Sequence, residues 1–169
     1  IYTNQLQRAG FELLSVPEDR DGIRTDILAD KLKTLGKRRS EISFAYIVTV
    51  NNPSCSILTT QRRIGLVRLV NKLCTEQRRK IPLVMDTAYE QLIHDPDTPT
   101  PDSALLHDEL GIVHEIGTLS KTLAPTLRVG YMLAKPSAFL DAMVQKVSDV
   151  GFSAPLLNQH VAALLLEQH

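Results

Sequence analysis

Lys121 and its neighbours are the part of this sequence best suited to chemistry. The lysine follows Ser120 directly and lies between two apolar runs, and Arg128 comes seven residues later. A cation at the end of a buried strand is costly unless an anionic or electrophilic group meets it. This spacing therefore predicts a ligand that offers the lysine and the arginine such a group.

Other polar residues occupy equivalent places in the chain. Three apolar runs are each followed closely by a residue that can bind a ligand, namely Asn52, Asp86 and Thr118. Tyr89 comes three residues after Asp86, a spacing that in a helix would return it to the same side. The sequence thus offers an amide, a carboxylate, a phenol and two hydroxyls beside the two cations.

Buried strands and amphipathic helices must position these residues. The apolar, largely β-branched runs predict strands over 44–50, 81–85, 111–117 and 129–134. Apolar residues at helical spacing predict helices over 25–35, 59–79, 136–149 and 155–168. This alternation predicts an α/β domain, a three-layer α/β/α arrangement around a mostly parallel sheet.

One connection is too short for that alternation. Only eleven residues separate Gly117 from Val129, whereas parallel neighbours need a crossover of a dozen or more. We therefore expect 129–134 to run antiparallel to 112–117. Its start, at Arg128, would then lie where the parallel strands end, which is the edge where open α/β sheets bind ligands.

Each of these residues also has an ordinary structural explanation. Asp86 could cap a helix over 87–93, and an asparagine before Pro53 is a common way to leave a strand. Tyr89 could be a half-buried packing residue, and a lone lysine after a strand is usually solvated. All of these explanations would have to coincide at one sheet edge, so we favour a binding site.

Composition narrows the function further. Lys plus Arg (19) balances Asp plus Glu (19), so no field of one sign favours nucleic acid or an anionic membrane. Two cysteines make no disulfide framework, the five histidines show no metal spacing, and no apolar run is long enough to cross a bilayer. We expect a cytoplasmic protein with no metal, nucleic-acid or membrane partner.

The motifs resemble a known family. The stretches "NNPS" followed by "TTQRR", then "IPLVMDTAYEQL", and finally "GTLSKTLAPTLRVGYMLA" are similar to the pyridoxal-phosphate (PLP) aminotransferases of class I/II, fold type I. The resemblance runs from about Gly10 to the end of the chain. Since the chain begins at Ile1 and stops inside an apolar helical pattern, we expect residues 1–169 to be part of the PLP-binding large domain, without its N-terminal part and without the C-terminal small domain.

The resemblance implies a role for each candidate residue. Lys121 would form a Schiff base with the cofactor aldehyde and later shuttle a proton, and Asp86 would keep the pyridine nitrogen protonated so that the ring withdraws electrons. Asn52 and Tyr89 would hydrogen-bond the phenolic oxygen of the ring. Arg128, with hydroxyls from Thr118 and Ser120, would hold the phosphate.

Two positions depart from the family pattern, and a third residue, Tyr2, could be mistaken for a family site residue. Cys55 stands where the family has glycine, which puts the backbone of that turn in doubt, and Thr118 replaces a more common serine. Tyr2 lies near the family's ring-stacking aromatic, but we take it to be a neighbour of that residue.

The resemblance implies an aminotransferase that moves an amino group between an amino acid and a 2-oxo acid and works as a homodimer when full length. Two alternatives stay open. One is another PLP reaction on the same scaffold, such as β-elimination from a sulfur amino acid by a C–S lyase. The other is the PLP-binding sensor domain of a transcription regulator, which would carry a basic DNA-binding segment upstream.

Overall fold

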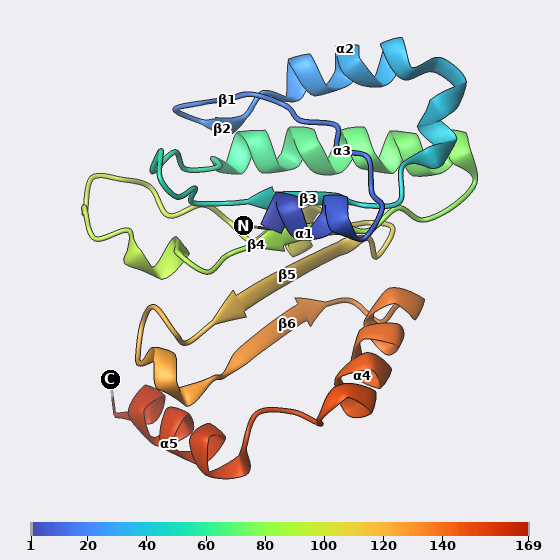
Figure 1. Cartoon of the computed structure of the whole chain (residues 1–169). Helices are drawn as coiled ribbons and strands as arrows, with labels where there is room; N and C mark the ends of the chain where they lie inside the picture. Colours follow the sequence, from blue (N-terminus) through green and yellow to red (C-terminus); the bar gives the residue numbers. More distant parts are fainter. Residues whose placement is uncertain (1, 169) are drawn as a thin grey trace.

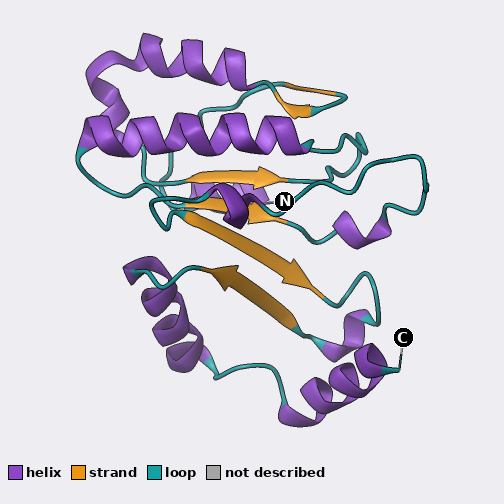
Figure 2. Ribbon diagram, turned by 180° about the vertical axis from the view of Figure 1, so that it is seen from behind, coloured by secondary structure: helices purple, strands orange, loops and turns teal. Residues whose placement is uncertain are grey.

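The described part of the chain folds into a four-stranded sheet and five α-helices, connected by loops and turns (Figures 1 and 2). The computed structural model describes residues 2–168, with side chains described from Thr3 onward. The helices are α1 (Tyr2–Arg8), α2 (Thr25–Leu35), α3 (Thr60–Gln77), α4 (Ala138–Val150) and α5 (Leu156–Glu167). The sheet strands are β3 (Ala45–Val48), β4 (Leu83–Asp86), β5 (Val113–Thr118) and β6 (Gly130–Ala134). A separate two-stranded ribbon joins β1 (Glu18–Asp19) to β2 (Gly22–Ile23), and 3₁₀ turns lie at η1 (Gly36–Glu41), η2 (Glu90–Leu92), η3 (Ala104–His107) and η4 (Pro125–Leu127).

The sheet order is β3-β4-β5-β6, with β3, β4 and β5 parallel and β6 antiparallel to β5. Both the mostly parallel α/β class and the reversed last strand are thereby confirmed. Thr118 pairs with Gly130, so the start of β6 lies at the end of β5. In Figure 1 the arrowheads of β3 and β5 and the start of β6 lie on the same side of the sheet.

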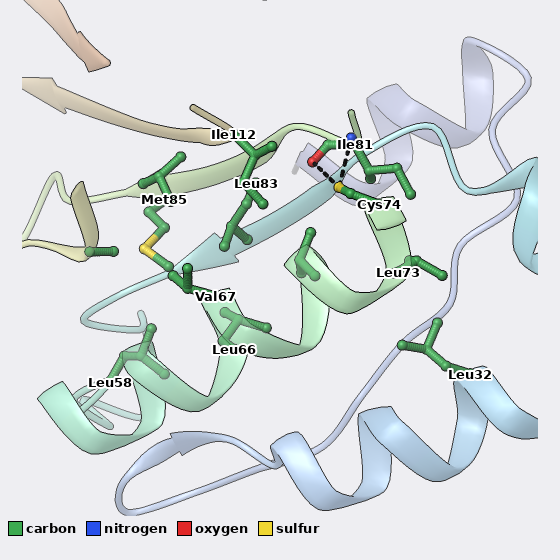
Figure 3. Close-up of a cluster of buried hydrophobic side chains, with 13 residues drawn as sticks. Leu32, Leu58, Leu66, Val67, Leu73, Cys74, Ile81, Leu83, Met85 and Ile112 are labelled. Atoms are coloured by element: carbon green, nitrogen blue, oxygen red, sulfur yellow. Dashed lines mark hydrogen bonds between the residues drawn. The ribbon is translucent and has the colours of Figure 1, made fainter. Parts of the chain in front are cut away.

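The core lies between α3 and one face of the sheet (Figure 3). Apolar residues at helical spacing along α3 (Leu66, Val67, Val70, Leu73 and Cys74) are buried. They pack against Leu83 and Met85, which alternate onto the same face of β4. The thiol of Cys74 also accepts a hydrogen bond from Ile81 N–H at 3.2 Å, which fixes the connection from α3 to β4.

Capping at both ends of α3 explains where the helix starts and stops. Thr59 Oγ1 accepts from the N–H of Arg62, and Arg78 adopts a left-handed conformation that closes the last turn. Outside α3 lies α2, whereas α4 and α5 lie beyond β6 on the opposite side of the molecule in both views (Figures 1 and 2). Within the described part of the chain, no helix combines the length and hydropathy that crossing a bilayer requires.

The segment after Asp86 forms the short 3₁₀ turn η2, because Thr87 turns back to the sheet and its N–H and hydroxyl donate to the carbonyl of Ile116. The alternative in which Asp86 caps a helix over 87–93 is therefore wrong. The N-cap position of α2 is Arg24, whose side chain makes no capping hydrogen bond.

Candidate cofactor site at the carboxyl edge of the sheet

Asn52 sits in a tight turn that follows β3. The turn spans 51–56 and is closed by hydrogen bonds between Asn51 and two later residues: the N–H of Cys55 donates to Asn51 C=O at 2.8 Å, and the N–H of Asn51 donates to Ser56 C=O at 3.0 Å. Cys55 has φ +58°, a left-handed conformation that favours glycine. The cysteine therefore keeps the backbone shape that a glycine would have there, and Asn52 is presented to solvent at the sheet edge.

A second element holds that turn from outside. Glu18 of β1 accepts hydrogen bonds from Asn51 Nδ2 at 2.8 Å and from Ser56 Oγ at 2.7 Å. Partial burial raises the pKa of the Glu18 carboxyl, but the hydrogen bonds from Ser54, Ser56 and Asn51 outweigh it and leave the pKa lowered. Glu18 lies 33 residues before Asn51, and no local pattern in the sequence indicated this contact.

Asp86 is the last residue of β4, and both of its carboxylate oxygens are engaged. Oδ1 accepts from the N–H of Ala88 at 3.1 Å, and Oδ2 accepts from the hydroxyl of Tyr46 at 2.5 Å. Val48 pairs with Asp86 in the parallel register, and Tyr46 lies two residues earlier on the same face of β3. Sequence reasoning missed Tyr46, although the period of two along β3 could have found it.

Tyr89 brings three segments together. Asn52 Nδ2 donates to the Tyr89 hydroxyl at 3.4 Å, and Lys121 Nζ lies 5.5 Å from the centre of the Tyr89 ring. These residues come from the turns after β3, β4 and β5, which are adjacent strands. The expected convergence at the carboxyl edge is therefore present for Asn52, Tyr89 and Lys121. Lys121 is solvent-exposed and lies in the turn over 119–123 that follows β5.

Thr118 and Ser120 form a hydroxyl pair at the end of β5. Their oxygens are 2.9 Å apart, and Thr118 Oγ1 also accepts from the N–H of Ser120 at 3.1 Å. The same threonine hydroxyl lies 3.2 Å from the carbonyl of Val129, which in turn accepts from the N–H of Leu119 at 3.0 Å. These contacts tie the lysine-bearing turn to the segment that enters β6.

Arg128 begins that segment in a left-handed conformation with φ +53°. Its Nη1 donates to the carbonyl of Pro125 at 3.1 Å, and the side chain is exposed. The preceding carbonyl, that of Leu127, accepts from Asn158 Nδ2 of α5 at 2.8 Å. The reversal of β6 thus brings Arg128 to the sheet edge at which β3, β4 and β5 end. The hydrogen bond to Pro125 directs the Arg128 guanidinium toward the preceding turn, η4.

The donor set suits an aromatic ligand that carries a phosphate and an aldehyde. It combines a primary amine, a carboxylate for a protonated ring nitrogen, an amide and a phenol for a ring oxygen, and a guanidinium with hydroxyls for a phosphate. Among the described residues, no group of three or more His, Cys, Asp and Glu side chains is arranged to hold a metal ion. The side chain of Tyr2 lies outside the described residues.

Comparisons with known proteins point in the same direction. The family model "Aminotransferase class I and II" matches residues 1–169. The chain is 31% identical over 126 residues to aromatic-amino-acid aminotransferase 1 of Thermococcus litoralis, covering 74% of this chain and 28% of that protein. It is 27% identical over 162 residues to the uncharacterized HTH-type transcriptional regulator YisV of Bacillus subtilis, covering 96% of this chain and 31% of that protein.

A solved aminotransferase structure has a similar fold. LysN, the alpha-aminoadipate aminotransferase of Thermus thermophilus, complexed with N-(5'-phosphopyridoxyl)-L-leucine, superposes with a TM-score of 0.71 at 26% identity. The match covers 92% of this chain and 38% of LysN. The chain spans about a third of the length of the curated relatives it matches.

Proposed function

Because the chain belongs to the aminotransferase class I and II family, we propose that it forms the PLP-binding part of an enzyme that exchanges an amino group between an amino acid and a 2-oxo acid. In this proposal, residues 1–169 are one portion of the large domain. The single observation that carries the proposal is the meeting of Asn52, Tyr89 and Lys121 from three successive strand ends. Few other ligands need an amine, an amide and a phenol beside a carboxylate.

When bound, PLP supplies an aldehyde that accepts the amino group and a ring that withdraws electrons from the substrate carbon. With the cofactor bound, the Nζ of Lys121 would hold its aldehyde, and as a free amine it would move a proton at the substrate carbon. Asp86 would accept a hydrogen bond from the protonated ring nitrogen, with its carboxylate held in place by Tyr46 and Ala88.

The remaining residues orient the ring and its phosphate. Asn52 and Tyr89 would donate to the ring oxygen, a role supported by their proximity, since Asn52 Nδ2 donates to the Tyr89 hydroxyl at 3.4 Å. Arg128, Thr118 and Ser120 would hold the phosphate, and the Arg128 guanidinium would exchange its hydrogen bond to the Pro125 carbonyl for one to a phosphate oxygen. The full-length protein acts as a homodimer in the cytoplasm, a location favoured by the two free thiols, Cys55 and Cys74.

Covalent trapping tests the proposal directly. The intact natural polypeptide that contains these residues is incubated with PLP and reduced with borohydride, and its peptides are mapped. We expect a pyridoxyl group on Lys121, lost in Lys121→Ala and retained in the control Lys72→Ala, whose side chain is 79% exposed on α3. A pyridoxyl group on Lys72, Lys135 or Lys146 instead would refute the assignment.

A panel of amino acids and 2-oxo acids then distinguishes transamination from a lyase reaction. Transamination leaves a new amino acid and a new 2-oxo acid in equal amounts. Release of ammonia and a thiol from a sulfur amino acid would identify the C–S lyase instead.

The likeness to YisV over 96% of this chain supports a second candidate, a PLP-binding sensor domain in a transcription regulator. Such a domain would bind the cofactor at the same residues without needing turnover. The intact natural polypeptide would then bind DNA in a PLP-dependent manner and give no transamination product. Product formation without DNA binding favours the enzyme.

A further inference from the structure

Arg63 is a buried cation with no part in the proposed chemistry. It lies in the first turns of α3 with 0% of its surface exposed. Its Nε donates to the carbonyl of Leu58 at 2.9 Å and its Nη1 to the carbonyl of Asp102 at 3.2 Å, while Nη2 pairs with the carboxylate of Glu90. A buried charge needs such partners, so the guanidinium binds three separate segments in a defined arrangement.

Glu90 directly follows Tyr89, and the other end of that short turn is also anchored. The backbone N–H and the hydroxyl of Thr87 both donate to the carbonyl of Ile116 in β5, at 2.8 and 3.0 Å. The N–H of Glu90 donates to the carbonyl of Thr87 at 3.1 Å, which closes the turn. Tyr89 is therefore held between one anchor on the sheet and one anchor on α3.

We propose that the hydrogen-bonded contact between the Arg63 guanidinium and the Glu90 side chain positions Tyr89, so that its hydroxyl stays within reach of Asn52 and of the cofactor ring oxygen. Both are positioning residues, because neither lies among the groups that meet the cofactor. This inference rests on the proposed function. It assigns to α3, a helix that otherwise only covers the sheet, control over one hydrogen bond in the site.

The test uses the intact natural polypeptide loaded with PLP and follows the pH at which the bound cofactor changes its absorption spectrum. A donor on the ring oxygen weakens the hold of that oxygen on the proton it shares with the lysine nitrogen. Tyr89→Phe should therefore raise the midpoint pH of this spectral change by about one unit, a tenfold change in proton affinity. Glu90→Ala should raise it by a similar amount. The double variant should show no further rise, because both changes remove the same hydrogen bond.

Two controls separate positioning from general stability. Glu90→Gln keeps an oxygen for Arg63 and should retain the wild-type midpoint. Glu76→Ala breaks a more exposed ion pair, in which Arg39 Nη1 and Glu76 Oε2 are 2.6 Å apart near the other end of α3, and should also leave the midpoint unchanged. If Glu90→Ala does not fold, Glu90→Asp, with its shorter reach, replaces it with the same expectation.

The outcomes are distinct. A wild-type midpoint in folded Glu90→Ala, or additive rises in the double variant, would overturn the positioning role alone. If the wild-type protein shows no PLP absorption that depends on Lys121, the proposed function fails, and the positioning role fails with it.

Discussion

At the scale of single residues, Asp86 shows how the fold prepares a carboxylate. Its two oxygens receive a backbone N–H from Ala88 and a hydroxyl from Tyr46, so the side chain is fixed before any ligand arrives. A carboxylate has about four lone-pair positions, and two hydrogen bonds leave room for a third partner. This preorganisation suits a group that must hold a protonated ring nitrogen.

Asp86→Asn tests that role. The amide can keep the contact with Ala88, but it cannot stabilise a proton on the ring nitrogen, so cofactor binding should persist while turnover collapses. We expect a loss of about a thousandfold in kcat, or about 4 kcal/mol of activation free energy. Steady-state kinetics and a PLP titration on the intact natural polypeptide measure both quantities.

The control for this change is Asp97→Asn, which alters an exposed carboxylate in the loop over 94–103 and should leave kcat unchanged. Near-normal turnover in Asp86→Asn would mean that the residue only closes the turn after β4.

At the scale of elements, His114 joins β5 to α4. Nδ1 lies 2.8 Å from the carbonyl of Ile112, which can only accept, so Nδ1 carries the proton of the neutral ring. Nε2 then accepts from the Ser137 hydroxyl at 3.1 Å, while Ser137 caps α4 by accepting from the N–H of Leu140 at 3.2 Å. The Phe139 ring packs edge-on against the imidazole, with ring centres 4.5 Å apart. The neutral histidine therefore suits this junction.

This junction predicts a pH dependence of stability. Burial lowers the pKa of His114 below its ordinary 6.5, opposed by the hydrogen bond to Ile112 and by the Asp108 charge. Between the folded pKa and about pH 6.5, His114 binds more protons in the unfolded chain than in the folded one. Its contribution to the free energy of unfolding is therefore fully present above about pH 6.5 and is lost as the pH falls through the folded pKa. One such group contributes at most about 1.4 kcal/mol per pH unit.

Urea unfolding of the chain at a series of pH values between 5 and 7 measures that slope. His114→Gln should flatten it, whereas His94→Gln, which changes an exposed histidine, should leave it intact. An unchanged slope in His114→Gln would assign the pH dependence to other groups.

At the scale of the whole molecule, α4, α5 and their connection expose many apolar side chains. The exposed ones are Met143, Val144, Val147, Val150, Phe152, Leu156, Leu157, Val161, Leu164, Leu165 and Leu166. Exposed apolar surface of this extent promotes association. The other side of the molecule differs, because α3 is covered by α2 and has its apolar side chains in the core.

Residues 1–169 purified alone should therefore self-associate, as measured by analytical ultracentrifugation over a range of concentrations. Val144→Glu combined with Leu157→Glu should reduce association without lowering the melting temperature, because these side chains are 64% and 72% exposed. We also expect no transamination by this piece with PLP present. A monodisperse, active monomer would contradict both expectations.

The sequence by itself determined the α/β class, the four sheet strands and the reversal of β6. Each depends on a local signal: apolar, β-branched runs for the strands, and a connection of eleven residues too short for a parallel crossover. The strand ends also placed Asn52, Asp86, Thr118 and Lys121 at one edge, because parallel strands end on the same side of a sheet.

Only the tertiary structure decided which side chains touch. Tyr46 reaches Asp86 across 40 residues of sequence, Glu18 holds the turn of Asn52 from a different ribbon, and Arg63 binds Glu90 from inside α3. The segment after Asp86 forms a 3₁₀ turn and not the helix that a capping role for Asp86 would need, because Thr87 bonds to β5. Such contacts depend on strand register and on helix packing, which arise when distant segments meet. A local pattern such as the period of two along β3 can indicate the face on which Tyr46 lies, but not which residue it meets.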